Sequence, residues 1–174
     1  MRILRGKTYI AKKNYIKFYL IIIVTIILGL AFYFSYEKYK EYQNKIPVLR
    51  GVTAEIKIDE LDDYLTENDK AIIYVGVADD NNSRELEEDL LLLIERADIR
   101  IVYLNITDIV NKTEFYENFN AKYSNGINLS NYPAVVLIED KKIVDLVEKD
   151  YSYLTLGRVQ QLFDIYEVKT NNYG

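Results

Sequence analysis

One uncharged apolar run interrupts the mixture of hydrophobic and polar positions near the N-terminus. Residues 18–34 read FYLIIIVTIILGLAFYF, with aromatic residues at both ends. A helix crosses the bilayer core with roughly 17–25 apolar residues, and aromatic side chains favour the two interfaces. We therefore predict a transmembrane helix over residues 18–36. No small-x-small pattern follows the run, which favours an uncleaved signal-anchor over a cleaved signal peptide.

Beyond residue 50, strand-like and helix-like periods alternate. VTAEIKI (52–58) alternates as a strand, and DELDDYLTEN (59–68) predicts a short helix with Asp59 as its N-cap. AIIYVGV (71–77) and RIVYLNI (100–106) are apolar runs typical of strands buried on both faces of a sheet. Between these two runs, apolar residues recur at helical spacing at Leu86, Leu90, Leu93 and Ile94. Strand, helix and strand in this order predict a right-handed crossover that joins parallel strands.

The rest of the chain predicts a helix, a hairpin and a last helix. TEFYENFNAKYSNG (113–126) has an aromatic face, and LTLGRVQQLFDIY (154–166) has an apolar stripe. NYPAVVLIEDKKIVDLVEK (131–149) contains two apolar runs joined by a charged turn, which indicates a hairpin. The order of elements predicts one α/β domain with a mixed central sheet over residues 51–168, followed by a tail (169–174).

Basic residues gather on one side of the apolar run. Residues 1–17 contain six lysines and arginines and no acid, whereas the lysines after the run are mixed with Glu37 and Glu41. By the positive-inside rule, residues 1–17 are a cytoplasmic N-terminus and the C-terminal domain lies outside the cell membrane. Residues 37–50 are predicted to form a stalk that is helical up to Pro47.

The charge of the chain is also uneven. The whole chain has a net charge of −5, but residues 47–174 contain 13 basic and 25 acidic residues, a net charge of −12. Such a domain is repelled by nucleic acid and by anionic lipid headgroups. We therefore expect no nucleic-acid partner, and we expect contact with the bilayer through residues 18–36 alone.

Cysteine and histidine are both absent from the sequence. Their absence removes thiol nucleophiles, disulfides, most zinc sites and acid–base catalysis by histidine. We expect no cofactor and no metal. Asp79, Asn81 and Ser83 alternate like the first ligands of a calcium loop, but Arg84 stands where glycine is needed and Leu90 where the bidentate glutamate belongs. The bias toward isoleucine, lysine, asparagine and tyrosine indicates an AT-rich bacterial gene.

Three stretches carry a resemblance to a known superfamily: AIIYVGVADDNNSRELEEDLLLLIE, IRIVYLNIT and AKYSNGINLSNYPAVVLIEDKKIVD. Their order, with Pro133 directly before the hairpin's first strand, resembles the thioredoxin-like superfamily, which places a cis-proline there. The resemblance implies a thioredoxin-like sandwich after a single N-terminal transmembrane helix. It also places Asp80 and Ser83 where the two cysteines of the Cys-x-x-Cys motif would stand, so thiol–disulfide oxidoreductase activity is not expected.

Besides the calcium loop considered above, the turn DDNNS (79–83) has three interpretations. It is a capped helix start without a ligand, with Asn82 or Ser83 as the cap and Glu85 completing a capping box. It is part of a retained binding groove formed by Asp79, Asp80, Ser83, Tyr132 and Pro133. Or it is catalytic through its carboxylates or Ser83, for which the sequence offers no histidine base. The acidic run 85–89 that follows is predicted to be a solvent-exposed helix face.

Two functions follow from these interpretations. The first is a non-catalytic, single-pass membrane protein whose redox-inactive domain binds or scaffolds a polypeptide partner on the extracytoplasmic side. Backbone pairing beside a cis-proline requires no thiol, so binding can persist without the cysteines. The alternative is a structural or accessory subunit of a membrane export or bacteriocin-type complex that acts through the span and the stalk.

Overall fold

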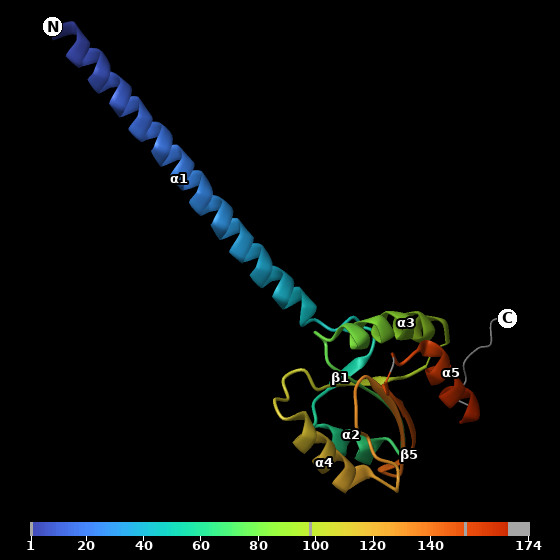
Figure 1. Cartoon of the computed structure of the whole chain (residues 1–174). Helices are drawn as coiled ribbons and strands as arrows, with labels where there is room; N and C mark the ends of the chain where they lie inside the picture. Colours follow the sequence, from blue (N-terminus) through green and yellow to red (C-terminus); the bar gives the residue numbers. More distant parts are fainter. Residues whose placement is uncertain (1, 98, 152, 167–174) are drawn as a thin grey trace. The chain divides into compact units, whose positions relative to one another are not determined.

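The computed structural model describes residues 2–97, 99–151 and 153–166 (Figure 1). The chain consists of two compact units, residues 1–43 and residues 44–174. Each unit is described by itself.

The first unit is formed by α1 (Arg2–Asn44), a single helix of 43 residues. Within its stretch Tyr15–Asn44, an 18-residue apolar window has a mean hydropathy of 2.4 and no buried side chain. Length and composition make this helix able to cross a membrane. At 1.5 Å per residue α1 is about 65 Å long, which leaves helix beyond a hydrocarbon core of about 30 Å.

The second unit contains a five-stranded mixed sheet in the order β1-β3-β2-β4-β5. The strands are β1 (Ala54–Ile56), β2 (Lys70–Gly76), β3 (Val102–Asn105), β4 (Ala134–Glu139) and β5 (Lys142–Glu148). Strands β1, β3 and β2 are parallel, whereas β4 pairs antiparallel with both β2 and β5. The predicted crossover, mixed sheet and hairpin are confirmed.

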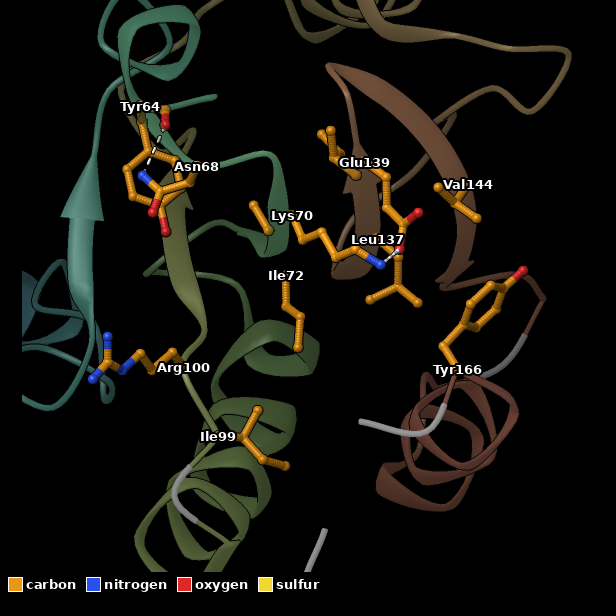
Figure 2. A pocket seen from close by; sticks show the side chains of 12 residues that line it. Tyr64, Asn68, Lys70, Ile72, Ile99, Arg100, Leu137, Glu139, Val144 and Tyr166 are labelled. Carbon is orange, nitrogen blue, oxygen red and sulfur yellow. Dashed lines mark hydrogen bonds and ion pairs between the residues drawn. The ribbon is translucent and has the colours of Figure 1, made fainter. Parts of the chain in front are cut away.

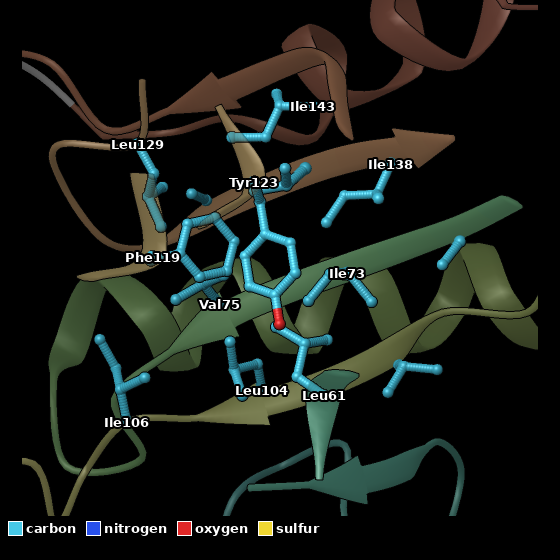
Figure 3. Close-up of a cluster of buried hydrophobic side chains, with 14 of the residues drawn as sticks. Leu61, Ile73, Val75, Leu104, Ile106, Phe119, Tyr123, Leu129, Ile138 and Ile143 are labelled. Carbon is cyan, nitrogen blue, oxygen red and sulfur yellow. The ribbon is translucent and has the colours of Figure 1, made fainter. Parts of the chain in front are cut away.

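Helices cover both faces of this sheet: α2 (Leu61–Glu67), α3 (Asn81–Ala97), α4 (Lys112–Tyr123) and α5 (Leu156–Ile165). Successive strand residues point to opposite faces, so Ile73 and Val75 enter one core and Tyr74 enters the other. The first core packs against α2 and α4, where Phe119 and Tyr123 point toward the sheet (Figure 3). The second core packs against α3 and α5 on the other face (Figure 1).

The turn between β4 and β5 is a tight two-residue connection. Asp140 and Lys141 both have positive φ, at 47° and 60°. Two successive residues with positive φ are what a type I′ hairpin turn requires, because its twist matches that of the strands.

One predicted helix start is wrong. Helix α2 has Glu60 as its N-cap, not Asp59, and its cap makes no side-chain bond to the helix. Instead the Glu60 carboxylate turns back and accepts a hydrogen bond of 2.8 Å from Lys57 N. The helix therefore begins where Leu61 can enter the core, since that side chain is fully buried.

Candidate functional site

The predicted site residues lie at one end of the sheet. Strands β2 and β3 run parallel and end there, at Gly76 and Asn105. Val75 pairs with Ala134, so the chain before β4 comes to the same end. The peptide bond Tyr132–Pro133 in this segment is cis, as the resemblance implied. The structure therefore brings residues 79–83 and 132–133 to a common end, and we call this end of the sheet the groove end.

The cap of α3 differs from the prediction. The Asp80 Oδ2 atom accepts a hydrogen bond of 2.9 Å from Ser83 N, which is the bond that an N-cap residue makes with the third residue of its helix. Neither Asn82 nor Ser83 is the cap, because α3 begins at Asn81 and both lie inside its first turn. The predicted capping box with Glu85 is also wrong, because Glu85 lies too far along the helix to reach the cap.

The five predicted groove residues differ in exposure. Asp79 is exposed, and Asp80 and Tyr132 are partly exposed. Ser83 is fully buried, its hydroxyl oxygen accepts a bond of 3.3 Å from Val77 N, and Pro133 is buried as well. A partner at this end would meet Asp79, Asp80 and Tyr132, while Ser83 and Pro133 shape the backbone beneath them.

Hydrogen bonds hold the loop before Pro133 in place. Tyr132 N donates to Asn131 Oδ1 over 2.9 Å, and Asn131 Nδ2 donates to Lys149 O over 2.9 Å. Lys149 N donates in return to Pro133 O over 3.0 Å. The Glu148 carboxylate accepts from the backbone N–H groups of Ser130 and Asn131 over 2.8 and 2.9 Å. This loop is therefore anchored to the end of β5.

Lys112, which sequence reasoning missed, also lies at this end. Its ammonium group donates to Ile109 O over 2.6 Å and to Ile106 O, both in the loop after β3. Burial lowers the pKa of Lys112, while the nearby carboxylates of Asp79 and Asp108 raise it. Because its ammonium protons are directed at backbone carbonyls, Lys112 holds the loop in place. Its amine is not available to act as a base. A lone lysine at a helix start carries no sequence signal for this role.

Glu87 is the second residue that sequence reasoning missed. Its side chain is fully buried, whereas Glu85 and Glu88 are exposed, so the prediction of a solvent-exposed acidic face is wrong at this position. Glu87 Oε2 accepts a bond of 2.7 Å from Val48 N, and Oε1 lies 3.2 Å from the Tyr74 hydroxyl. Burial raises the pKa of Glu87. A signal existed, because positions 83, 87, 90 and 94 form one helical stripe.

A cavity of about 470 Å³ lies at the opposite end of the sheet (Figure 2). It lies against the start of β2 and the end of β4, where Lys70 Nζ is 2.8 Å from Glu139 Oε1. Tyr64, Ile72, Arg100 and Tyr166 also line it. None of the predicted groove residues reaches this cavity. Across the described residues, no three acidic, histidine or cysteine side chains converge as metal ligands would.

Comparison with solved structures identifies the fold. Thioredoxin f2 of Chlamydomonas reinhardtii is similar to this chain with a TM-score of 0.51 at 16% sequence identity, over 66% of this chain and 96% of that one. Plasmodium falciparum thioredoxin is similar with a TM-score of 0.50 at 11% identity, over 66% and 99% of the two chains. The domain thus has the thioredoxin fold. No family model matches the sequence, and no curated protein does.

Proposed function

We propose that this protein is a membrane-anchored, non-catalytic thioredoxin-fold module that binds an extended segment of a polypeptide partner at the groove end. The observation that carries the proposal is a thioredoxin fold whose groove end brings the turn 79–83 together with Tyr132 and Pro133. By the resemblance, Asp80 and the buried Ser83 stand where the redox cysteines would be. The chain has no cysteine, so its own residues provide no thiol for disulfide exchange. Binding beside the cis-proline is the family property that needs no thiol.

Exposed apolar side chains at the groove end support the proposal. Val110 follows β3 and is 99% exposed, and Tyr151 follows β5 with its side chain entirely exposed. The segment after β3 leaves the sheet at the same end as residues 132–133, because Gly76 pairs with Asn105 and Val75 with Ala134. The segment after β5 does so too, because Lys149 N bonds Pro133 O. Tyrosine is enriched at protein interfaces because it joins a large apolar ring to a polar tip.

The charges at this end favour a basic partner segment. Asp79 and Asp108 are exposed, and Asp80 is partly exposed beside them. The cation of Lys112 is directed into the loop carbonyls rather than toward solvent. An incoming lysine or arginine would therefore meet a group of carboxylates, which speeds association and aligns the partner.

The loop before Pro133 sets a condition on how a partner binds. Tyr132 N is already hydrogen-bonded to the Asn131 side chain over 2.9 Å. A partner strand that pairs with this N–H has to displace the Asn131 amide, whereas a partner held by side chains does not. Replacing Asn131 by alanine frees the N–H and should tighten binding only in the first case.

The proposal is tested by photocrosslinking in the native membrane. A photoreactive residue replaces Asp79 or Tyr132, and the control replaces Asp164, which is exposed on α5. Asp80 is avoided because its side chain caps α3. We expect the same polypeptide to be crosslinked from positions 79 and 132 and none from position 164. Adding Asp79→Lys should abolish crosslinking from position 132. Equal background at all three positions would refute the groove.

A second candidate function rests on α1. Its apolar stretch and the stalk provide a surface for helix packing within a membrane complex, with the domain as a spacer. In both functions we propose that the N-terminus is cytoplasmic and the domain extracytoplasmic. Exchange of residues 18–36 for an unrelated span separates the two functions, because a groove partner is retained and a span-dependent partner is lost.

A further inference from the structure

The chain enters the domain through a segment that is fastened to α3. We call residues 44–49 the junction. Within it, Pro47 is buried and Leu49 is fully buried in the core with Tyr74 and Leu86. Val48 N donates to the buried Glu87 carboxylate over 2.7 Å, a contact between residues 39 positions apart. The junction is therefore packed into the domain and is not a free linker.

Arg84 joins the junction to the turn at the groove end. Its Nη1 atom lies 3.1 Å from Asn44 O, 3.0 Å from Ile46 O and 3.1 Å from Ala78 O. Asn44 and Ile46 belong to the junction, whereas Ala78 directly precedes Asp79. One guanidinium nitrogen thus lies between the carbonyls of two segments that are more than thirty positions apart in the sequence.

A second connection runs through Glu87, one helical turn after Arg84. While Glu87 Oε2 holds Val48, Oε1 lies 3.2 Å from the Tyr74 hydroxyl, which also lies 3.1 Å from Ser83 O. Ser83 in turn supports the turn, because its hydroxyl oxygen accepts a bond from Val77 N and its own N–H bonds Asp80. Junction and turn therefore share two hydrogen-bonded paths through the first turns of α3.

We propose that the junction and the turn 77–83 open and close as one coupled unit, with Arg84 and Glu87 as the positioning residues that link them. Release of the junction would remove two of the three carbonyls around Arg84 and would leave the buried Glu87 carboxylate without its backbone donor, which is unfavourable in an apolar site. Both side chains would then rearrange, which would disturb the Arg84 contact with Ala78 O and the Tyr74 contact with Ser83 O. Coupling of this kind is reciprocal by thermodynamic necessity.

The consequence for function rests on the proposed groove. A partner that binds at the turn would tighten the junction, and tension or displacement of the stalk would loosen the groove. Allosteric couplings between protein sites typically change an affinity by about 5–150-fold. The module would then report occupancy of the groove to its membrane anchor without any change in the sheet.

Hydrogen exchange of the full chain in detergent micelles tests the coupling without a partner. The junction is read at the Val48 amide and the turn at the Val77 and Ala78 amides, all of which are hydrogen-bonded. Arg84→Gln is compared with Arg96→Gln, an exposed arginine in the last turn of the same helix. We expect Arg84→Gln to speed exchange at both ends by at least about fivefold, with Arg96→Gln unchanged. The central-strand amides of Ile73 and Val136 show whether opening is local.

The reverse perturbation provides a second arm. Asp80→Ala removes the bond to Ser83 N at the turn and touches nothing in the junction, and Asn82→Ala is its control. Because the coupling is reciprocal, the Val48 amide should exchange faster in Asp80→Ala than in the unmodified chain. The proposal is overturned if Val48 is unchanged there, or if Arg84→Gln opens one end alone. If Arg84→Gln also speeds exchange at Ile73 and Val136, the opening in that variant is global, and the result of Asp80→Ala decides whether junction and turn are coupled. Failure of photocrosslinking would leave these measurements unaffected, so the two proposals fail separately.

Discussion

Tyr74 and Tyr103 stack on neighbouring strands with ring centroids 5.1 Å apart and planes inclined by 28°. Both rings are fully buried beneath α3. The Tyr74 hydroxyl is within bonding distance of Ser83 O and Glu87. The Tyr103 hydroxyl makes no well-formed hydrogen bond among the described residues, although burial and the nearby Glu87 carboxylate raise the pKa of Tyr103. Two similar rings in one stack therefore differ in what their hydroxyl groups contribute.

This difference predicts opposite outcomes for the two phenylalanine variants. Tyr74→Phe leaves Ser83 O and the buried Glu87 carboxylate short of a donor, so we expect a loss of about 1–3 kcal/mol in the free energy of unfolding. Tyr103→Phe removes a buried hydroxyl that makes no well-formed hydrogen bond, and we expect no loss or a small gain. Urea unfolding of the two variants measures both values. An equal loss in both variants would contradict the assignment of partners.

Glu87 predicts how stability depends on pH. Because burial raises the pKa of Glu87 in the folded state above its ordinary value of 4.5, folding favours the neutral carboxyl group. This contribution is fully present below the unfolded pKa and is lost as pH rises through the folded pKa. Glu87→Gln stays neutral, so its urea midpoint should fall less than that of the unmodified chain as pH rises above 4.5. The exposed neighbour Glu88 provides the control, because Glu88→Gln removes a carboxylate of the same helix from the surface rather than from the core. Parallel curves for all three proteins would show that Glu87 titrates normally.

The start of α3 predicts which polar residue in the turn matters for stability. Loss of an N-cap side chain costs about 0.5–2 kcal/mol, so Asp80→Ala should destabilise by this amount while Asp80→Asn retains most of the stability. Asn82→Ala should change the free energy of unfolding by less than about 0.5 kcal/mol, because its side chain is not the cap. Thermal or urea unfolding checks the order. A larger effect at Asn82 would restore the cap predicted from the sequence.

The hairpin turn predicts a difference in stability between two variants of Lys141. Lys141 has φ of 60°, a conformation that costs a non-glycine residue about 1–2 kcal/mol. Lys141→Gly should therefore be more stable than Lys141→Ala by about 1 kcal/mol. Both variants lose the same ammonium group 3.5 Å from Asp62, so that contact cancels in the comparison. Equal unfolding midpoints for the two variants would refute the strain.

Local sequence patterns predicted most of the fold. The apolar runs of β2 and β3, the paired runs of the hairpin and the helical spacing of Leu86 and Leu90 each follow from a period of two or 3.6 residues. These periods extend over a few neighbouring residues, so they can be read without knowledge of distant contacts. Element boundaries were less well predicted. The caps at Glu60 and Asp80 were missed because several polar residues near each helix start can serve, and packing selects among them.

The candidate site was predicted in outline. The sequence located the turn and the cis-proline loop, and the antiparallel pairing of β4 with β2 brought them together. It could not show that Ser83 points inward, that Asn131 occupies Tyr132 N, or that Lys112 is directed at loop carbonyls. Each of these depends on the direction of one side chain within a packed structure, which residue type and spacing do not determine.

The sequence alone determined the long apolar helix that could cross a membrane, the order of strands and helices, and the absence of every thiol. These properties depend on composition and on local periodicity, which exist before the chain folds. The tertiary structure alone decided which backbone group pairs with the buried Glu87, and that Val48 and Arg84 bind the junction to the groove end. The physical reason is that a carboxylate or guanidinium is stable in the interior only when distant backbone groups arrive to pair with it.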